Sequence, residues 1–144
     1  MSYTHPTDEQ LAEIYRSTGT IAVVGASTNE TKPAHRIPAY LQAQGFRIIP
    51  VNPVADEVLG QAAVDSLSEI SEHVDVVDVF RRAELTPEIA SEAVSIGAGV
   101  LWLQAGISSD EAAEIAMDGG LRIVMDTCMG ATHQRLVEAG LLER

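Results

Sequence analysis

One stretch of the chain, residues 20–36, combines the residue types that hold an anion. It has the sequence TIAVVGASTNETKPAHR, in which a β-branched apolar run ends at Gly25 and a polar loop leads to Pro33. Proline suits the first position of a helix, where its missing N–H is not needed. A strand, loop and helix in this order present unpaired N–H groups and the positive end of a helix dipole to a phosphate. The stretch therefore predicts a site for a phosphate-rich, nucleotide-like ligand.

Strands and helices must alternate along the chain to position this loop. Apolar β-type runs begin near residues 21, 47, 74, 100 and 122, and helical patterns separate most of them. Such alternation is typical of a parallel sheet with right-handed crossovers. We expect an α/β, Rossmann-like, doubly wound sheet of about five strands in the order 3-2-1-4-5, with helices on both faces. Asp75 and Asp78 interrupt the third run, which predicts that this strand is less deeply buried than the first.

The length and the N-terminal pattern predict one domain over residues 1–144. Thr7 and Gln10 form a capping box ahead of an apolar stripe, which predicts a helix over residues 8–17. A second capping box, Ser108 with Glu111, predicts another helix start. The segment 55–71 is rich in turn residues and predicts at most a short strand or a helical turn.

Composition excludes several classes of partner. The chain has 21 acidic against 9 basic residues and a net charge of −12, which disfavours nucleic acid and anionic membranes as partners. It has no apolar run long enough to span a membrane and no signal-peptide pattern. Its single cysteine, Cys128, fits a reducing compartment. These features predict a cytoplasmic protein, and no spacing of ligating residues predicts a metal site.

The residues after each predicted strand share a common chemistry. The carboxyl ends of parallel strands meet at one edge of the sheet, where ligands bind. Small residues, amides, hydroxyls and guanidinium groups gather at these ends, which predicts a cleft for a phosphate and a nucleoside. The ends are residues 25–27, 51–53, 80–82, 104–106 and 126–128.

A dinucleotide cofactor is the first alternative for such a cleft, but its fingerprint is incomplete. The G-x-G-x-x-G motif requires glycines where this chain has Ser27 and Glu30. The ribose also requires a carboxylate after the second strand, where the chain has Asn52 and Pro53. An NAD(P)-type ligand is therefore kept only as an alternative.

A combination of motifs resembles the stand-alone bacterial and archaeal CoA-binding domain proteins. The resemblance covers residues 18–137 and extends to the N-terminal CoA-binding domain of the succinyl-CoA synthetase α subunit. It implies a Rossmann-like fold that binds coenzyme A. The motifs are Gly25-Ala26-Ser27, Lys32-Pro33 with Arg36, Val51-Asn52-Pro53, Val79-Phe80-Arg81, residues 102–106 (WLQAG) and Asp126-x-Cys128.

The resemblance also implies a role for each site residue. Gly25, Ala26 and Ser27 would line the phosphates, while Lys32 and Arg36 would neutralise them. The remaining residues would surround the rest of the ligand. Val51 and Pro53 would flank the adenine or ribose, with Asn52 between them as a further site residue. Val79, Phe80 and Arg81 would form the opposite wall, and Gln104 would lie near the pantetheine arm.

The chain departs from the synthetases, which need a ligase domain and an ATP-grasp partner. We therefore expect it to bind CoA or an acyl-CoA without catalysing a reaction on its own, with no catalytic residue assigned. An alternative is the CoA-carrying component of a multi-subunit acyl-CoA ligase or acyltransferase, and either a homo-oligomer or a separate ligase subunit is open. A reactive thiol at Cys128 is a third hypothesis, because the following helix N-terminus could activate it. The acyl group and the pathway are not predicted.

Overall fold

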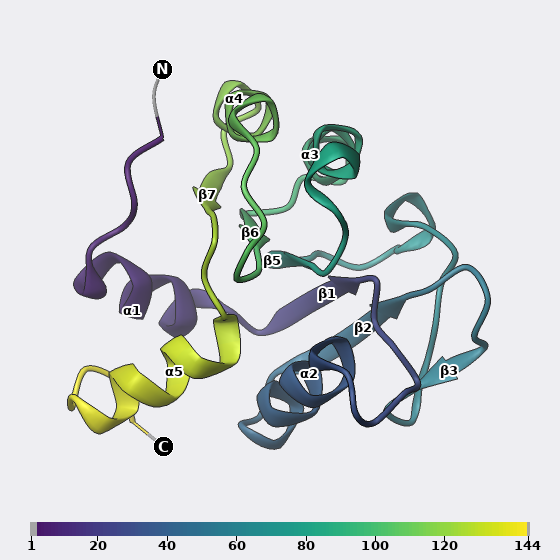
Figure 1. Cartoon of the computed structure of the whole chain (residues 1–144), viewed down its shortest axis with the longest axis horizontal. Coiled ribbons are helices and arrows are strands. Elements are labelled where there is room, and N and C mark those ends of the chain that lie inside the picture. The colour runs from purple at the N-terminus through teal and green to yellow at the C-terminus, as the bar shows by residue number, and fades with distance from the viewer. Residues whose placement is uncertain (1–2, 144) are drawn as a thin grey trace.

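The computed structural model describes residues 3–143, so residues 1, 2 and 144 of the predicted domain lie outside the described residues. A five-stranded parallel sheet forms the centre, and a small two-stranded hairpin lies at its side (Figure 1). The helices are α1 (Asp8–Ser17), α2 (Pro33–Ala43), α3 (Thr86–Ser95), α4 (Asp110–Asp118) and α5 (Met129–Glu138), with 3-10 turns η1 (Leu67–Glu69) and η2 (Ala83–Leu85). The sheet contains β1 (Thr20–Val24), β2 (Arg47–Val51), β5 (Val76–Val79), β6 (Val100–Leu103) and β7 (Arg122–Val124), and the hairpin contains β3 (Glu57–Val58) and β4 (Gln61–Ala62).

Two apolar layers cover the sheet, and the alternation along β1 shows how they arise. Ile21 and Val23 pack toward α1, α2 and α5, whereas Ala22 and Val24 pack toward α3 and α4. Successive side chains of a strand point to opposite faces, so each strand contributes to both layers. Figure 1 shows α3 and α4 on one side of the sheet and the other three helices on the opposite side. The predicted Rossmann-like fold with helices on both faces is confirmed.

The order of the parallel strands is β2-β1-β5-β6-β7, which places the third strand of the chain beside the first. In the expected order 3-2-1-4-5, the third strand would instead be an edge strand beside the second. Pro50 explains the difference, because proline cannot donate a ladder hydrogen bond and favours an edge strand. In the observed order β2 is an edge strand: Pro50 is paired with Val23 on one side, and on the other side an isolated bridge to Val64 needs only the Pro50 carbonyl as an acceptor.

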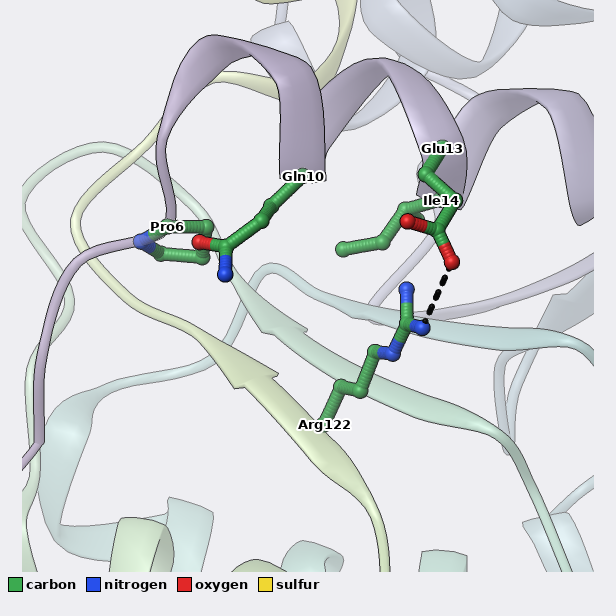
Figure 2. A pocket seen from close by; sticks show the side chains of 5 residues that line it. All are labelled: Pro6, Gln10, Glu13, Ile14 and Arg122. Atoms are coloured by element: carbon green, nitrogen blue, oxygen red, sulfur yellow. Dashed lines mark hydrogen bonds and ion pairs between the residues drawn. The ribbon is translucent and has the colours of Figure 1, made fainter.

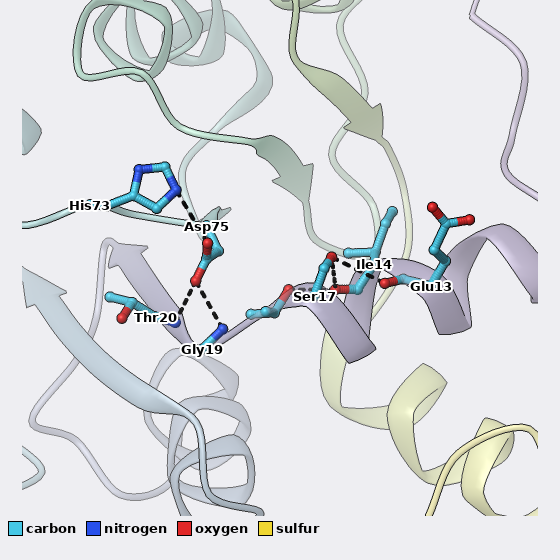
Figure 3. Close-up of polar contacts among 8 residues, drawn as sticks. Glu13, Ile14, Ser17, Gly19, Thr20, His73 and Asp75 are labelled. Carbon is cyan, nitrogen blue, oxygen red and sulfur yellow. Dashed lines mark hydrogen bonds and ion pairs between the residues drawn. The ribbon is translucent and has the colours of Figure 1, made fainter.

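The third parallel strand, β5, is the centre of the sheet and is fully enclosed. All four of its residues are buried, including Asp78, whose exposed fraction is 0%. The expectation of a less buried strand was therefore wrong. Asp75, just before β5, instead has a structural role: its Oδ2 accepts hydrogen bonds from the Gly19 and Thr20 amides at 2.8 and 2.9 Å (Figure 3). This carboxylate joins the amino ends of β1 and β5.

The predicted N-terminal helix is confirmed as α1, with the Thr7–Gln10 capping box formed in both directions. The N-cap of α4 is Ser109, one residue after the predicted Ser108. The turn-rich segment contains η1 as well as the β3–β4 hairpin, which was not predicted. Within residues 3–143, no helix combines the length and apolarity needed to cross a membrane.

Candidate functional site

A cleft of about 680 Å³ opens at the carboxyl ends of β5 and β6, next to the N-terminus of α2. In the sheet, β2 lies on one side of β1, whereas β5 and the later strands lie on the other side. The direction in which strands are added therefore reverses between β1 and β5. Ligands of open α/β sheets bind outside the strand ends at such a point. The cleft is lined by Lys32, Pro33, Ala34, Ile37, Phe80, Arg81, Arg82, Ala83, Gln104, Ala105, Gly106, Ile107 and Cys128.

Gly25 ends β1 with a backbone that only glycine adopts readily. Its φ is +89°, and a Cβ there would lie 2.8 Å from the Phe80 carbonyl oxygen and 3.0 Å from Arg81 Cδ. The Gly25 amide donates to the Val51 carbonyl, and the Phe80 amide donates to the Val24 carbonyl. Gly25 therefore lets the chain turn away from β1 while the end of β5 packs against it.

The loop between Gly25 and α2 is held by its own hydrogen bonds. The Ser27 amide donates to the Ala34 carbonyl at 3.2 Å, and His35 Nδ1 lies 2.8 Å from the Ser27 carbonyl oxygen. Ser27 Oγ accepts the Asn29 amide at 3.0 Å. The Ser27 amide is thus engaged within the protein, while its hydroxyl hydrogen can still be donated to a ligand.

The N-terminus of α2 has no side-chain cap, since its N-cap residue is Lys32 and its first residue is Pro33. Around it lie cations that have no carboxylate partner: among the described residues, Lys32, Arg36 and Arg81 form no ion pair within 4.0 Å. Four other arginines do form one. These are Arg47 with Glu72, Arg82 with Glu84, Arg122 with Glu13 and Arg135 with Asp8.

Arg81 also lines a second, smaller hollow of about 220 Å³, which Gly25 borders as well. Gly25, Val51 and Pro53 border this hollow, together with the carboxylates of Asp65, Glu88 and Glu92. Burial, with a smaller contribution from neighbouring Glu88, raises the pKa of Glu92. The two spaces therefore share Arg81 as a lining residue, and the smaller one adds acidic residues that the sequence had not indicated.

The structure brings seven of the twelve predicted site residues to these two spaces. Lys32, Phe80 and Gln104 line the cleft, Gly25, Val51 and Pro53 line the smaller hollow, and Arg81 lines both. The other five line neither: Ala26 and Val79 are buried, Arg36 is exposed in the first turn of α2, and Ser27 and Asn52 support the loops.

Asn52 links the ends of β1 and β2. Its Nδ2 donates to the Ala26 carbonyl at 2.9 Å, and its Oδ1 accepts from the amides of Val54 and Ala55. Its side-chain oxygen therefore bonds the protein backbone, which gives Asn52 a structural function at the rim.

Gln104 and Asp78 form a buried pair beneath the cleft. Gln104 Nε2 donates to Asp78 Oδ1 at 2.5 Å, while Gln104 Oε1 and Asp78 Oδ2 are enclosed and have no hydrogen-bond partner in the part of the chain that the structure describes. Burial raises the pKa of Asp78 to about 7, against a smaller lowering by the Gln104 hydrogen bond. The sequence singled out Gln104 but gave no role to Asp78, although a carboxylate inside an apolar strand was a visible signal.

Cys128 lies at the N-cap of α5 and borders the cleft, half-buried. Its Sγ accepts the Ala131 amide at 3.4 Å. Nearby, Asp126 has a φ of +52°, and its Oδ1 accepts the Gly106 amide at 2.6 Å. Asp126 thus fixes the loop after β6, a role that the sequence did not reveal.

Another hollow, of about 260 Å³, lies between α1 and the start of β7, away from the carboxyl edge. Figure 2 shows Arg122 directed at Glu13, and the two form an ion pair of 3.0 Å. Because this cation is neutralised, the hollow lacks the free positive charge of the cleft. Residues 3–143 also contain no group of three or more metal-ligating side chains.

The fold and the cleft define a class: a Rossmann-like domain with a cationic space at its topological switch point. Residues 19–134 match the family described as the CoA binding domain, so the chain belongs to that family.

Relatives of known sequence or structure agree with this membership. The chain is 39% identical to "Uncharacterized protein YneT" of Bacillus subtilis over 129 residues, covering 90% of this chain and 96% of the relative. It is 32% identical to "Acetate--CoA ligase [ADP-forming] II" of Archaeoglobus fulgidus, covering 72% of this chain but only 17% of that protein. A solved structure, "hypothetical protein from Pyrococcus horikoshii OT3", has a TM-score of 0.89 and 38% identity, with coverage of 95% and 99%.

Proposed function

We propose that the chain binds coenzyme A or an acyl-CoA in the cleft at the strand ends, without catalysing a reaction on its own. The observation that carries this proposal is the pair of cations, Lys32 and Arg81, that line one cleft and have no carboxylate partner within residues 3–143. The chain has a net charge of −12, so acidic residues that could pair with a cation are plentiful. Cations left free around a cleft favour an anionic ligand, and charge-assisted bonds to phosphate are strong.

The shape of the site supports a ligand with two unlike parts. The smaller hollow joins apolar side chains to carboxylate acceptors, which suits an adenosine with its ring faces and N–H donors. The larger cleft continues past Arg81 to Gln104 at the end of β6, which gives it the length to hold a flexible arm. CoA has this composition: a phosphorylated adenosine joined through phosphates to an arm with two amides. A dinucleotide is less suitable, because the end of β2 offers Asn52, whose side chain is bonded to backbone groups.

Calorimetric titration tests the proposal with CoA, acetyl-CoA, NAD, NADP and ATP as separate ligands in reducing buffer. We expect CoA and acetyl-CoA to bind and NAD and NADP to give no heat of binding. Binding of NAD without binding of CoA would overturn the proposal.

A second candidate is the CoA-carrying component of a multi-subunit ligase or acyltransferase. It is favoured by the similarity to an acetate–CoA ligase, in which the matching region is a small part of a longer protein. Purification from native extract tests it. Co-elution with a larger ATP-binding subunit supports this candidate, and a homo-oligomer without other subunits contradicts it.

A further inference from the structure

We propose that Asp78 and Gln104 form a proton-dependent pair that holds one wall of the cleft in place, so that the protonation of Asp78 regulates ligand binding. This inference rests on the proposed function, because it concerns the affinity of that same cleft for its ligand. Gln104 follows β6 directly, and the three residues after it, Ala105, Gly106 and Ile107, line the cleft. The pair therefore lies where it can fix the position of the lining.

Residues 104–107 form a tight turn, called the wall turn below, whose position depends on Gln104. The Ile107 amide donates to the Gln104 carbonyl at 2.9 Å, and the Gln104 amide donates to the Val79 carbonyl at the end of β5 at 3.3 Å. The Gly106 amide donates to Asp126 Oδ1 at 2.6 Å. Asp126 thus holds the middle of the turn, while Gln104 joins its first residue to the centre of the sheet.

The side-chain contact between Asp78 and Gln104 leaves one oxygen of each partner unpaired. Gln104 Nε2 donates to Asp78 Oδ1, but Asp78 Oδ2 and Gln104 Oε1 are both enclosed without a partner in the described residues. Two buried acceptors without a donor cost free energy. One proton on Asp78 Oδ2 removes both deficits, because the carboxylic acid then donates to Gln104 Oε1 while Oδ1 still accepts from Nε2. Exchanging the two ends of the amide gives an equivalent pair.

The surroundings of Asp78 in the sheet favour this neutral form. The side chain is fully buried, and its cross-strand neighbours are Val23 on β1 and Trp102 on β6. Burial raises the pKa of Asp78 to about 7, and no charge elsewhere in residues 3–143 contributes to the shift. A carboxylate here would have neither water nor a cation to stabilise it.

The helices over this face of the sheet also carry titratable side chains. These are Tyr15 of α1, Tyr40 of α2, Cys128 at the start of α5 and His133 of α5. Burial, and to a smaller extent Asp78, raises the pKa of Tyr15, whereas burial lowers the pKa of His133. Both shifts favour the uncharged side chain. Tyr15 and His133 therefore supply no cation that would keep Asp78 ionised.

Loss of the proton breaks the second hydrogen bond of the pair. The carboxylate then turns an acceptor toward Gln104 Oε1, and its charge keeps a single hydrogen bond inside an apolar layer. The wall turn loses this attachment to β5, and a ligand that contacts the turn must order it on binding. That ordering lowers the affinity. A rise in pH through the neutral range should therefore weaken binding.

Calorimetry at about pH 6 and about pH 8.5 tests this regulation, with acetyl-CoA as the ligand because it has no free thiol to titrate. We expect the wild type to bind about fivefold or more weakly at the higher pH. Asp78→Asn can bond both ends of the Gln104 amide at every pH, so it should keep the tighter affinity at both values. Asp78→Leu has a similar shape but cannot bond Gln104, so it should bind weakly at both. Groups that titrate elsewhere act on all three proteins alike. The same pH dependence in the wild type and in Asp78→Asn would overturn the inference.

Nuclear magnetic resonance of the wild type tests the pair without relying on a variant that has to fold. The carboxyl carbon of Asp78 and the side-chain amide carbon of Gln104 should shift with one common midpoint near pH 7. Saturating acetyl-CoA should move this midpoint upward, by about one pH unit for a tenfold coupling, because linkage is reciprocal. A midpoint in the ordinary acidic range of a carboxyl group, or one that the ligand leaves unchanged, contradicts the inference.

Two outcomes distinguish this inference from the proposed function. Binding of acetyl-CoA with one affinity across the pH range contradicts the regulation alone. Absence of binding at both pH values contradicts the proposed function and the regulation together, whereas the two carbon shifts in the free protein still decide whether the pair forms.

Discussion

Gln104 Nε2 donates a 2.5 Å hydrogen bond to Asp78 Oδ1, and this contact joins the wall of the cleft to a carboxyl group enclosed within the sheet. Asp78 lies on β5 between Val23 of β1 and Trp102 of β6. The packing around it is apolar, which is why burial has such a large effect on its protonation. Asp78 should therefore contribute to the pH dependence of stability.

Asp78→Asn should remove a pH dependence of stability. Burial raises the pKa of Asp78 from 3.8 to about 7 in the folded chain, so between these values the unfolded chain releases a proton that the folded chain keeps. The free energy of unfolding then falls as pH rises through that window, by about 4 kcal/mol in total. Urea denaturation across the window should show this fall in the wild type and a flatter profile in the variant. Parallel profiles would contradict the assignment.

Lys32→Glu should weaken CoA binding about tenfold or more, because a phosphate partner becomes a repelling charge. The loss should grow as the salt concentration falls, since fewer ions screen the repulsion. Arg47→Glu is the matched control: it makes the same change in net charge at the start of β2, away from the cleft. Calorimetry at two salt concentrations checks both variants. Equal losses in the two would remove Lys32 from the site.

Gly25→Ala should lower the free energy of unfolding by about 1–3 kcal/mol and weaken ligand binding. Two effects contribute: a φ of +89° and a Cβ that would lie 2.8 Å from the Phe80 carbonyl oxygen. Gly45→Ala separates them, because Gly45 has a φ of +102° but its Cβ would meet nothing within 4 Å. Thermal and urea unfolding should show a larger loss for Gly25→Ala. If the two variants lose equally, the close approach of β5 has no energetic role.

Asp75→Ala should destabilise the fold by about 2 kcal/mol, since the two amides that its carboxylate accepts lose their partner. Asp75→Asn retains an oxygen acceptor but not the charge, so it should lose less. Urea denaturation of both variants measures the difference. Similar losses would show that the charge matters more than the hydrogen bonds to Gly19 and Thr20.

The sequence predicted most elements of the fold because each has a local cause. The capping box at Thr7, the proline at the start of α2 and the apolar runs of the strands act within a few residues. The strand order depends on distant pairing, and the preference of Pro50 for an edge strand did not enter the predicted order. The hairpin of β3 and β4 is too short to leave an apolar pattern.

The candidate site was predictable at the strand ends but not in its details. Parallel strands bring their carboxyl ends together whatever the sequence between them, so the prediction of a cleft needed only the strand assignments. The Gln104–Asp78 bond joins residues 26 positions apart on neighbouring strands, and the Asp126–Gly106 bond joins residues 20 positions apart. Side-chain contacts of this kind depend on register and rotamers, which no local pattern specifies.

The position of β5 beside β1 has a consequence for the order in which the protein can form. A ribosome delivers the loop at residues 25–32 long before Arg81, and Cys128 later still. Since β1 gains its second neighbour only when β5 docks, no early fragment presents the whole binding surface. A ligand that touches Lys32, Arg81 and Cys128 would recognise only the finished sheet, and its binding would protect folded chains in preference to unfinished ones.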